Sequence, residues 1–193
     1  MRLMLLPALL LIVPPGVSGQ GSSLTIRLAN DTERERRTRD QLEAVLRRFE
    51  VSRWIETREI LIDENTTPHS HPVLTLHTRH LDNDLQLLST FVHEQFHWYV
   101  NRERERRDSV IAAFRQHYRD VPVGGSAGAR DAASTYLHLV VCDLEFQALT
   151  MLVGREEAKR TLERFTHYQW IYERVLEEPF VRSVMTRHAL ILR

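Results

Sequence analysis

Three residues in the stretch 90–99 have the types and spacing of a metal-dependent hydrolase. The stretch reads TFVHEQFHWY and contains the pattern H-E-x-x-H at His93, Glu94 and His97. Residues four apart lie about 40° apart around an α-helix and one turn along it, so His93 and His97 can present both imidazoles to one metal ion. Glu94 is placed beside them as a base for the attacking water. The pattern therefore predicts a zinc-binding helix with a catalytic carboxylate.

The residues around this pattern favour a buried helix. The residues at 82–84 (DND) are of types that commonly cap helix N-termini. Apolar residues then recur at intervals of three and four, at Leu85, Leu88, Val92, Phe96 and Tyr99. His93 and His97 fall on an adjacent face, where we expect them to look into a cleft beside the core. Without such a cleft they would be ordinary histidines on a helix surface.

The other elements predicted by the sequence are strands early in the chain and helices late. Alternating or β-branched residues predict strands at 23–28, 59–63 and 73–78. Apolar spacing predicts further helices at about 32–49, 109–118, 132–153, 155–177 and 180–192, with a glycine-containing loop at 120–131. This order indicates an α+β fold, with a small antiparallel or mixed sheet of about three strands packed on a helical body. The strand at 73–78 is also a candidate edge for pairing with an extended peptide.

A third metal ligand must come from outside the H-E-x-x-H pattern. A catalytic zinc usually takes three protein ligands and keeps a position for water. The predicted helix 132–153 carries His138 and Glu145 on one face, two turns and about 10.5 Å apart along the axis. Because both cannot easily reach one zinc ion, we expect one of the two, or another residue, to complete the site.

The combination of HEQFH at 93–97 with a later helical Glu145, in the context DLEFQAL, resembles the gluzincin type of zinc peptidase. In that type, a second helix carries a Glu ligand. The resemblance implies a zincin-like fold in which His93, His97 and Glu145 bind Zn²⁺ and Glu94 is the general base.

The stretch 70–148 also resembles a group of small bacterial HExxH proteins. Leu144 stands where gluzincins often have Asn, and the extra helical domain of larger relatives has no counterpart in this sequence. If Glu145 binds the metal, His138 becomes a candidate to stabilise the oxyanion, as a His does in similar enzymes.

The first 19 residues resemble a secretory signal. Arg2 is a minimal positive region, 3–13 is an apolar run, and 17–19 (VSG) resembles a cleavage site. We expect cleavage after Gly19, a single domain over 20–193, and a secreted or periplasmic protein. An uncleaved anchor and an overextended start of a cytosolic chain are the alternatives. No other segment approaches twenty consecutive apolar residues, so no integral membrane segment is expected after signal removal.

The net charge and the cysteine content indicate which binding partners and which cysteine chemistry the protein can have. The chain has 26 Lys and Arg against 26 Asp and Glu, so its overall charge gives no basis for binding nucleic acid or a membrane surface. Cys142 is the single cysteine, which excludes an internal disulfide, and we expect it to fill space in the core. The histidines at 69, 71, 77 and 80 are expected at the surface or in hydrogen bonds rather than in a second metal site.

Taken together, these residues predict a zinc metallopeptidase that acts on a peptide or protein substrate, with Glu94 as the base. Two other classes are compatible with the sequence. One is a secreted protein that keeps its metal for stability and has no hydrolytic activity. The other is a helical interaction protein without metal.

Overall fold

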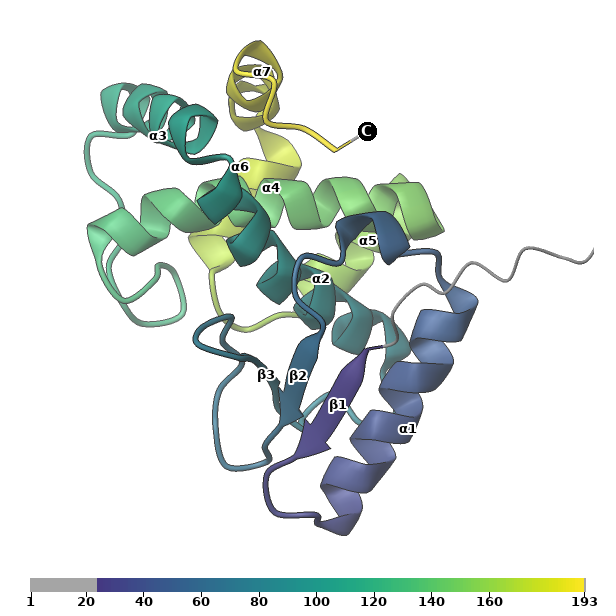
Figure 1. Cartoon of the computed structure of the whole chain (residues 1–193). Coiled ribbons are helices and arrows are strands. Elements are labelled where there is room, and N and C mark those ends of the chain that lie inside the picture. The colour runs from purple at the N-terminus through teal and green to yellow at the C-terminus, as the bar shows by residue number, and fades with distance from the viewer. Residues whose placement is uncertain (1–23, 193) are drawn as a thin grey trace, which may run out of the picture.

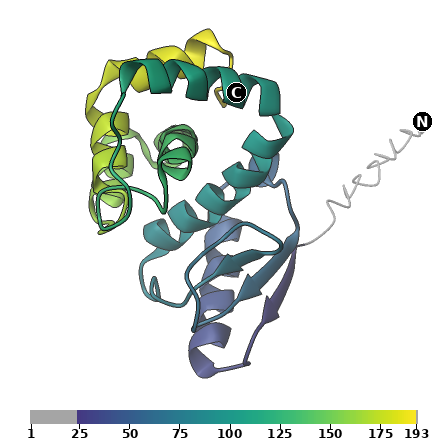
Figure 2. The ribbon, with the colours of Figure 1, turned by 90° about the vertical axis from the view of Figure 1, so that its left-hand side faces the viewer.

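The helix α4 (Ala132–Val153) runs through the centre of the helical part of the computed structural model, which describes residues 24–192. Fourteen of its residues are buried, so it contacts other helices on all sides. Figure 2 looks nearly along its axis. The helices that pack against it are α2 (Asp84–Arg102), α3 (Arg104–His117), α5 (Arg155–Glu163), α6 (Gln169–Glu177) and α7 (Pro179–Arg187).

By length and composition alone, α4 could cross a membrane. In the structure, 72% of its most apolar 18-residue window is buried inside the protein. The expected signal at 1–19 lies outside the described residues.

The sheet contains β1 (Thr25–Leu28), β2 (Glu59–Ile62) and β3 (Leu74–Leu76), side by side in that order. All three strands are parallel, so the expectation of an antiparallel or mixed sheet is wrong. The reason lies in the two connections: the helix α1 (Glu33–Arg48) returns the chain to the same end of the sheet between β1 and β2, and the segment 63–73 does so between β2 and β3. In Figure 1 the sheet and α1 lie at one end of the molecule and α2 connects them to the later helices. The α+β class itself is confirmed.

A buried carboxylate joins the sheet to the start of α1. The hydroxyl of Thr32 accepts from the main-chain N–H of Glu35 at 3.2 Å, which caps the helix. The Glu35 carboxylate in turn accepts from the main-chain N–H of Asn30 (2.9 Å) and of Glu64 (3.2 Å). Burial raises the pKa of Glu35, but these hydrogen bonds and the one from the side-chain amide of Asn30 (3.0 Å) together outweigh this effect and hold the pKa below the ordinary value. Its charge therefore fixes the loops that follow β1 and β2.

The chain after α4 departs from the predicted pattern. We expected one helix over 155–177, but the structure has α5 and α6 separated by the segment 164–168. Tyr168 at the end of this segment has φ of 56°, in the left-handed region that non-glycine residues rarely adopt. The next residue, Gln169, donates its main-chain N–H to the carbonyl of Ser126 at 2.9 Å. The loop 120–131 therefore helps to fix the break.

The C-terminal segment is attached to α4 by buried polar groups. The carboxylate of Asp143 accepts hydrogen bonds from Arg182 on α7 (3.0 Å) and from Gln147 (2.9 Å). The side-chain oxygen of Gln147 accepts from the main-chain N–H of Leu192 at 3.0 Å. These contacts fix the end of the described chain against the central helix.

Candidate metal centre

Three histidine side chains meet where α2 packs against α4. His93 and His97 lie on α2 and His138 lies on α4. Each residue has a ring nitrogen that lies within 4.8 Å of a ring nitrogen of both others. The ring centroids are 5.1 Å apart for His93 and His97, 5.5 Å for His93 and His138, and 5.0 Å for His97 and His138. The described residues thus contain a group of imidazoles that could hold a metal ion.

Two of these rings are oriented by hydrogen bonds of their Nδ1 atoms. Nδ1 of His93 lies 2.9 Å from Oε2 of Glu145, and Nδ1 of His138 lies 2.7 Å from the carbonyl oxygen of Ser134. Both Nδ1 atoms can donate in these bonds, so Nε2 is the nitrogen of each ring that remains to bind a metal. Metal-binding histidines usually have this arrangement, with the second nitrogen bonded to a carboxylate or a carbonyl.

Glu145, the other candidate ligand, is surrounded by donors. Its Oε1 accepts from the hydroxyl of Ser89, and its Oε2 accepts from His93 and from the hydroxyl of Tyr172 at 3.1 Å. The residue is 1% exposed. Both carboxylate oxygens are therefore already hydrogen-bonded to the protein.

Glu145 also belongs to a second group of metal-ligating side chains. One ligand atom each of His93, Cys142 and Glu145 lie within 4.8 Å of one another. The two groups share His93, so the structure brings both predicted third ligands to the motif helix. Cys142 is fully buried, as expected for a core residue, and burial raises the pKa of its thiol to about 11.

The three clustered histidines differ in their electrostatics. Burial, with a smaller effect from nearby His93, lowers the pKa of His97 well below its ordinary value and that of His138 to about 3. Both rings are therefore neutral at pH 7 and have lone pairs for a metal. Burial also acts to lower the pKa of His93, but the carboxylate of Glu145 and the thiol of Cys142 together outweigh this effect and raise it well above the ordinary value, so a metal that binds His93 must displace a proton.

Glu94 faces the same cleft as the histidines. The cleft has a volume of about 810 Å³ and is lined by all three clustered histidines, by Glu94 and by Glu145. Glu94 is 6% exposed, and its carboxylate has no hydrogen-bond partner among residues 24–192. Burial raises its pKa to about 7, against a smaller lowering effect of His93. Glu94 can therefore exchange a proton near neutral pH.

Other parts of the chain supply the walls of the cleft. Five more histidines line it, at positions 69, 71, 77, 80 and 167. Neither group of metal-ligating side chains found in the described part of the chain includes any of them. The segment 164–168 contributes Tyr168, whose ring centroid lies 4.4 Å from that of His138.

The sequence pattern did not reveal this wall. Tyr168 falls three residues after Phe165, where the apolar spacing of a continuous helix would also place a core residue. The sequence nevertheless contains an indication of a helix break at 166–168 (THY). Thr, His and Tyr are all weak helix formers, and here they follow one another directly.

The segment that precedes β3 covers part of the sheet edge. Thr75 of β3 donates its main-chain N–H to the carbonyl of His69 (2.8 Å), and its own carbonyl accepts from His69 (3.1 Å), as an isolated antiparallel bridge. The indole N–H of Trp98 on α2 donates to the carbonyl of Ser70 at 2.9 Å. The outer edge of β3 is thus occupied at Thr75, and the segment 67–70 forms the rim above α2.

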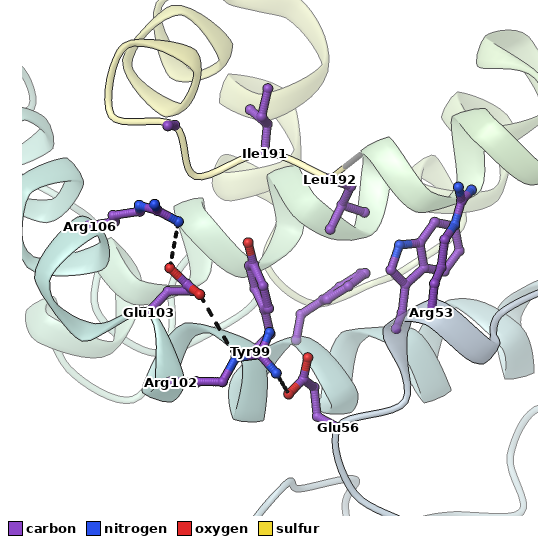
Figure 3. A pocket seen from close by; sticks show the side chains of 11 residues that line it. Arg53, Glu56, Tyr99, Arg102, Glu103, Arg106, Ile191 and Leu192 are labelled. Carbon is purple, nitrogen blue, oxygen red and sulfur yellow. Dashed lines mark hydrogen bonds and ion pairs between the residues drawn. The ribbon is translucent and has the colours of Figure 1, made fainter. Parts of the chain in front are cut away.

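A second cavity, of about 310 Å³, lies on another face of α2 and is shown in Figure 3. Its charged side chains other than Arg53 pair with one another. Glu103 lies between Arg102 and Arg106, at 3.8 Å and 2.7 Å, and Arg102 also pairs with Glu56. Neither histidine nor cysteine lines this cavity, so it is not a candidate metal site.

All five site residues predicted from the sequence therefore meet in or beside one cleft. His93, His97 and His138 cluster at its floor, Glu94 lies next to them, and Glu145 contacts His93. Compared with protein-family models, with curated proteins and with solved structures, the chain gives no significant match.

Proposed function

We propose that this protein is a zinc-dependent peptidase whose metal is held by His93, His97 and His138. The observation that carries the proposal is the clustering of three imidazole nitrogens at the floor of a cleft that also contains Glu94. Three histidines with a position left open for water are a known ligand set of catalytic zinc. The hydrogen bonds of His93 and His138 fit this role, because they leave one nitrogen of each ring available.

The hydrogen bonds favour His138 over Glu145 as the third ligand. The resemblance to gluzincins implies Glu145, yet its two oxygens already accept from Ser89, His93 and Tyr172. A carboxylate bonded to the far nitrogen of a ligand histidine orients that ring and increases its basicity. We assign this positioning role to Glu145, and His138 then acts as a ligand rather than as an oxyanion donor.

The group formed by His93, Cys142 and Glu145 is the less suitable site. A cysteine binds metal as the thiolate, and the raised pKa of Cys142 opposes that form. Cys142 also does not line the cleft, so a metal held there would be less accessible to a substrate.

In the proposed mechanism, zinc at this site would supply the Lewis acidity that polarises a peptide carbonyl. Glu94, with a pKa near 7, accepts a proton from the attacking water. The same carboxyl group then donates that proton to the leaving amine. Glu145 keeps the His93 ring in place through both steps.

The proposal is tested by replacing Glu94 with Gln, which keeps the shape and removes the base. We expect Glu94→Gln to retain stoichiometric zinc in elemental analysis and to lose hydrolysis of a peptide library by at least about 100-fold. Glu103→Gln, at the C-terminal cap of the same helix but in the second cavity, is the matched control and should retain turnover. Unchanged turnover of Glu94→Gln would contradict the mechanism. Zinc binding without cleavage of any peptide by the natural sequence would instead favour a metal-stabilised binding protein.

A further inference from the structure

The charges along the cleft are unevenly distributed. Two arginines line it, Arg79 shortly after β3 and Arg130 shortly before α4. The carboxylates that line it are Glu94 and Glu145, and both are buried at its floor. Glu145 is moreover occupied by its contact with His93. The outer part of the cleft therefore carries cations that no lining carboxylate balances.

Both arginines are available to a ligand. Arg79 is exposed, and its guanidinium has no hydrogen bond or ion pair with any of the residues from 24 to 192. The side chain of Arg130 is 89% exposed and pairs at 3.2 Å with Asp131, its neighbour in the chain. Asp131 also accepts from the main-chain N–H of Ser134 as the cap of α4, so it has a second partner if Arg130 moves.

The remaining lining residues offer little to a large apolar side chain. Apart from aromatic residues with polar groups, the apolar residues that line the cleft are Pro68, Leu137 and Phe165. A basic side chain would meet two guanidinium groups and find no free carboxylate at the rim. An acidic side chain is the class that these charges attract, because opposite charges across an interface favour binding and like charges oppose it.

We infer that the cleft selects acidic peptides, with Arg79 and Arg130 binding Asp or Glu side chains near the scissile bond. A guanidinium group binds a carboxylate with two parallel hydrogen bonds, so arginine suits this role better than a simple point charge. The inference rests on the proposed peptidase function and names its substrate class.

The test compares synthetic peptides that differ only at the residues flanking one bond, which are Glu and Asp, Gln and Asn, or Lys. We expect kcat/KM to be highest for the acidic peptides and lowest for those with Lys. The preference for acidic over neutral peptides should fall about three- to fivefold in Arg79→Gln and in Arg130→Gln, as for an exposed ion pair. It should also fall as salt is added. Arg119→Gln, an exposed arginine outside the cleft, is the control and should leave the preference unchanged.

A binding measurement separates this inference from the proposed function. Fluorescence anisotropy of the same labelled peptides with zinc-loaded Glu94→Gln should show the same order of affinity without turnover. If no peptide is cleaved by the natural sequence but the acidic ones bind best, the peptidase proposal fails and the selectivity stands. Equal or tighter binding of neutral or basic peptides overturns the selectivity. A preference that survives in both arginine variants overturns the assignment of Arg79 and Arg130.

Discussion

A single carboxylate, Glu145, connects several residues of the candidate site. It accepts from Ser89 and His93 on α2 and from Tyr172 on α6, while it stands on α4 itself. It therefore links three helices around one buried charge. Such charge-assisted hydrogen bonds are stronger than neutral ones, and they hold the His93 ring at a defined angle.

The roles proposed for Glu145 and His138 predict different losses of metal affinity when each residue is replaced. In Glu145→Gln the ring of His93 keeps its place but loses a charged partner, so we expect zinc affinity to fall about 10- to 100-fold. In His138→Ala a proposed ligand is itself removed, and we expect a larger loss. Competition with a chelator of known affinity measures both. A variant His138→Ala that binds zinc as the natural sequence does, beside a Glu145→Gln that binds none, would show that Glu145 is the ligand.

At the residue scale, the sequence alone predicts the part of the site that lies within one turn of one helix. His93, Glu94 and His97 are related by helical spacing, which fixes their relative positions without knowledge of the fold. Which of His138 and Glu145 lies nearer to His93 and His97 depends on where along α4 the helix α2 packs against it. Both residues share a face of α4, so nothing in their own spacing could decide it.

At the scale of the elements, the loop 120–131 fixes the position of the segment 164–168, which forms one wall of the cleft. Its residue Gly128 packs so closely on the chain that an added Cβ would lie 2.1 Å from the carbonyl oxygen of Pro122. The hydroxyl of Thr135 on α4 donates to that same carbonyl at 2.9 Å and accepts from the N–H of Ala129 at 3.0 Å. The loop is thus fixed to α4 as well as to the start of α6.

Substituting the closely packed glycine should loosen this wall. We expect Gly128→Ala to destabilise the protein by about 2 kcal/mol or more, because main chain must move to admit the methyl group. Gly125→Ala is the matched control: its φ of 62° is strained for alanine, but nothing lies within 4 Å of the added Cβ. We expect it to cost only about 1 kcal/mol. Urea unfolding of both variants gives the comparison, and an equal or smaller effect at Gly128 would contradict it.

Element boundaries were predictable where local chemistry marks them. The predicted bounds of α4 agree with the observed ones, and in the structure Asp131 caps its start and Gly154, with φ of 80°, ends it. The break at 164–168 was not predictable from apolar spacing, since it is maintained by a distant loop through the hydrogen bond of Gln169 to Ser126. The parallel sheet was missed for a related reason, because strand direction depends on the paths of α1 and of the segment 63–73.

Over the whole molecule, the proposed ligands come from two helices that belong to different parts of the fold. In Figure 1, α2 extends from the sheet toward the later helices, and α4 is central among those helices. A metal bound by residues of both helices would link the sheet end of the molecule to its helical end. The apolar core of α2 and α4 is continuous, so we expect the fold to persist without the metal.

Removing the metal should therefore lower thermal stability without unfolding the protein at room temperature. Zinc at about 1,000 times its Kd stabilises the folded state by about 4 kcal/mol. For a domain of this size, that change corresponds to a decrease in Tm of roughly 10 °C on chelation. Scanning calorimetry with and without chelator measures the shift, and circular dichroism reports the retained helices. Identical transitions in both conditions would argue against a metal bound between α2 and α4.

The burial of Cys142 gives the protein an intrinsic chemical reporter. Its thiol is the single one in the chain, has no exposed surface, and stands on α4 beside His93 of α2. An alkylating reagent can reach it only when these helices separate, so the labelling rate equals the opening rate at reagent concentrations where labelling is faster than reclosing. The natural sequence thus allows the opening of the site region to be timed without any introduced probe.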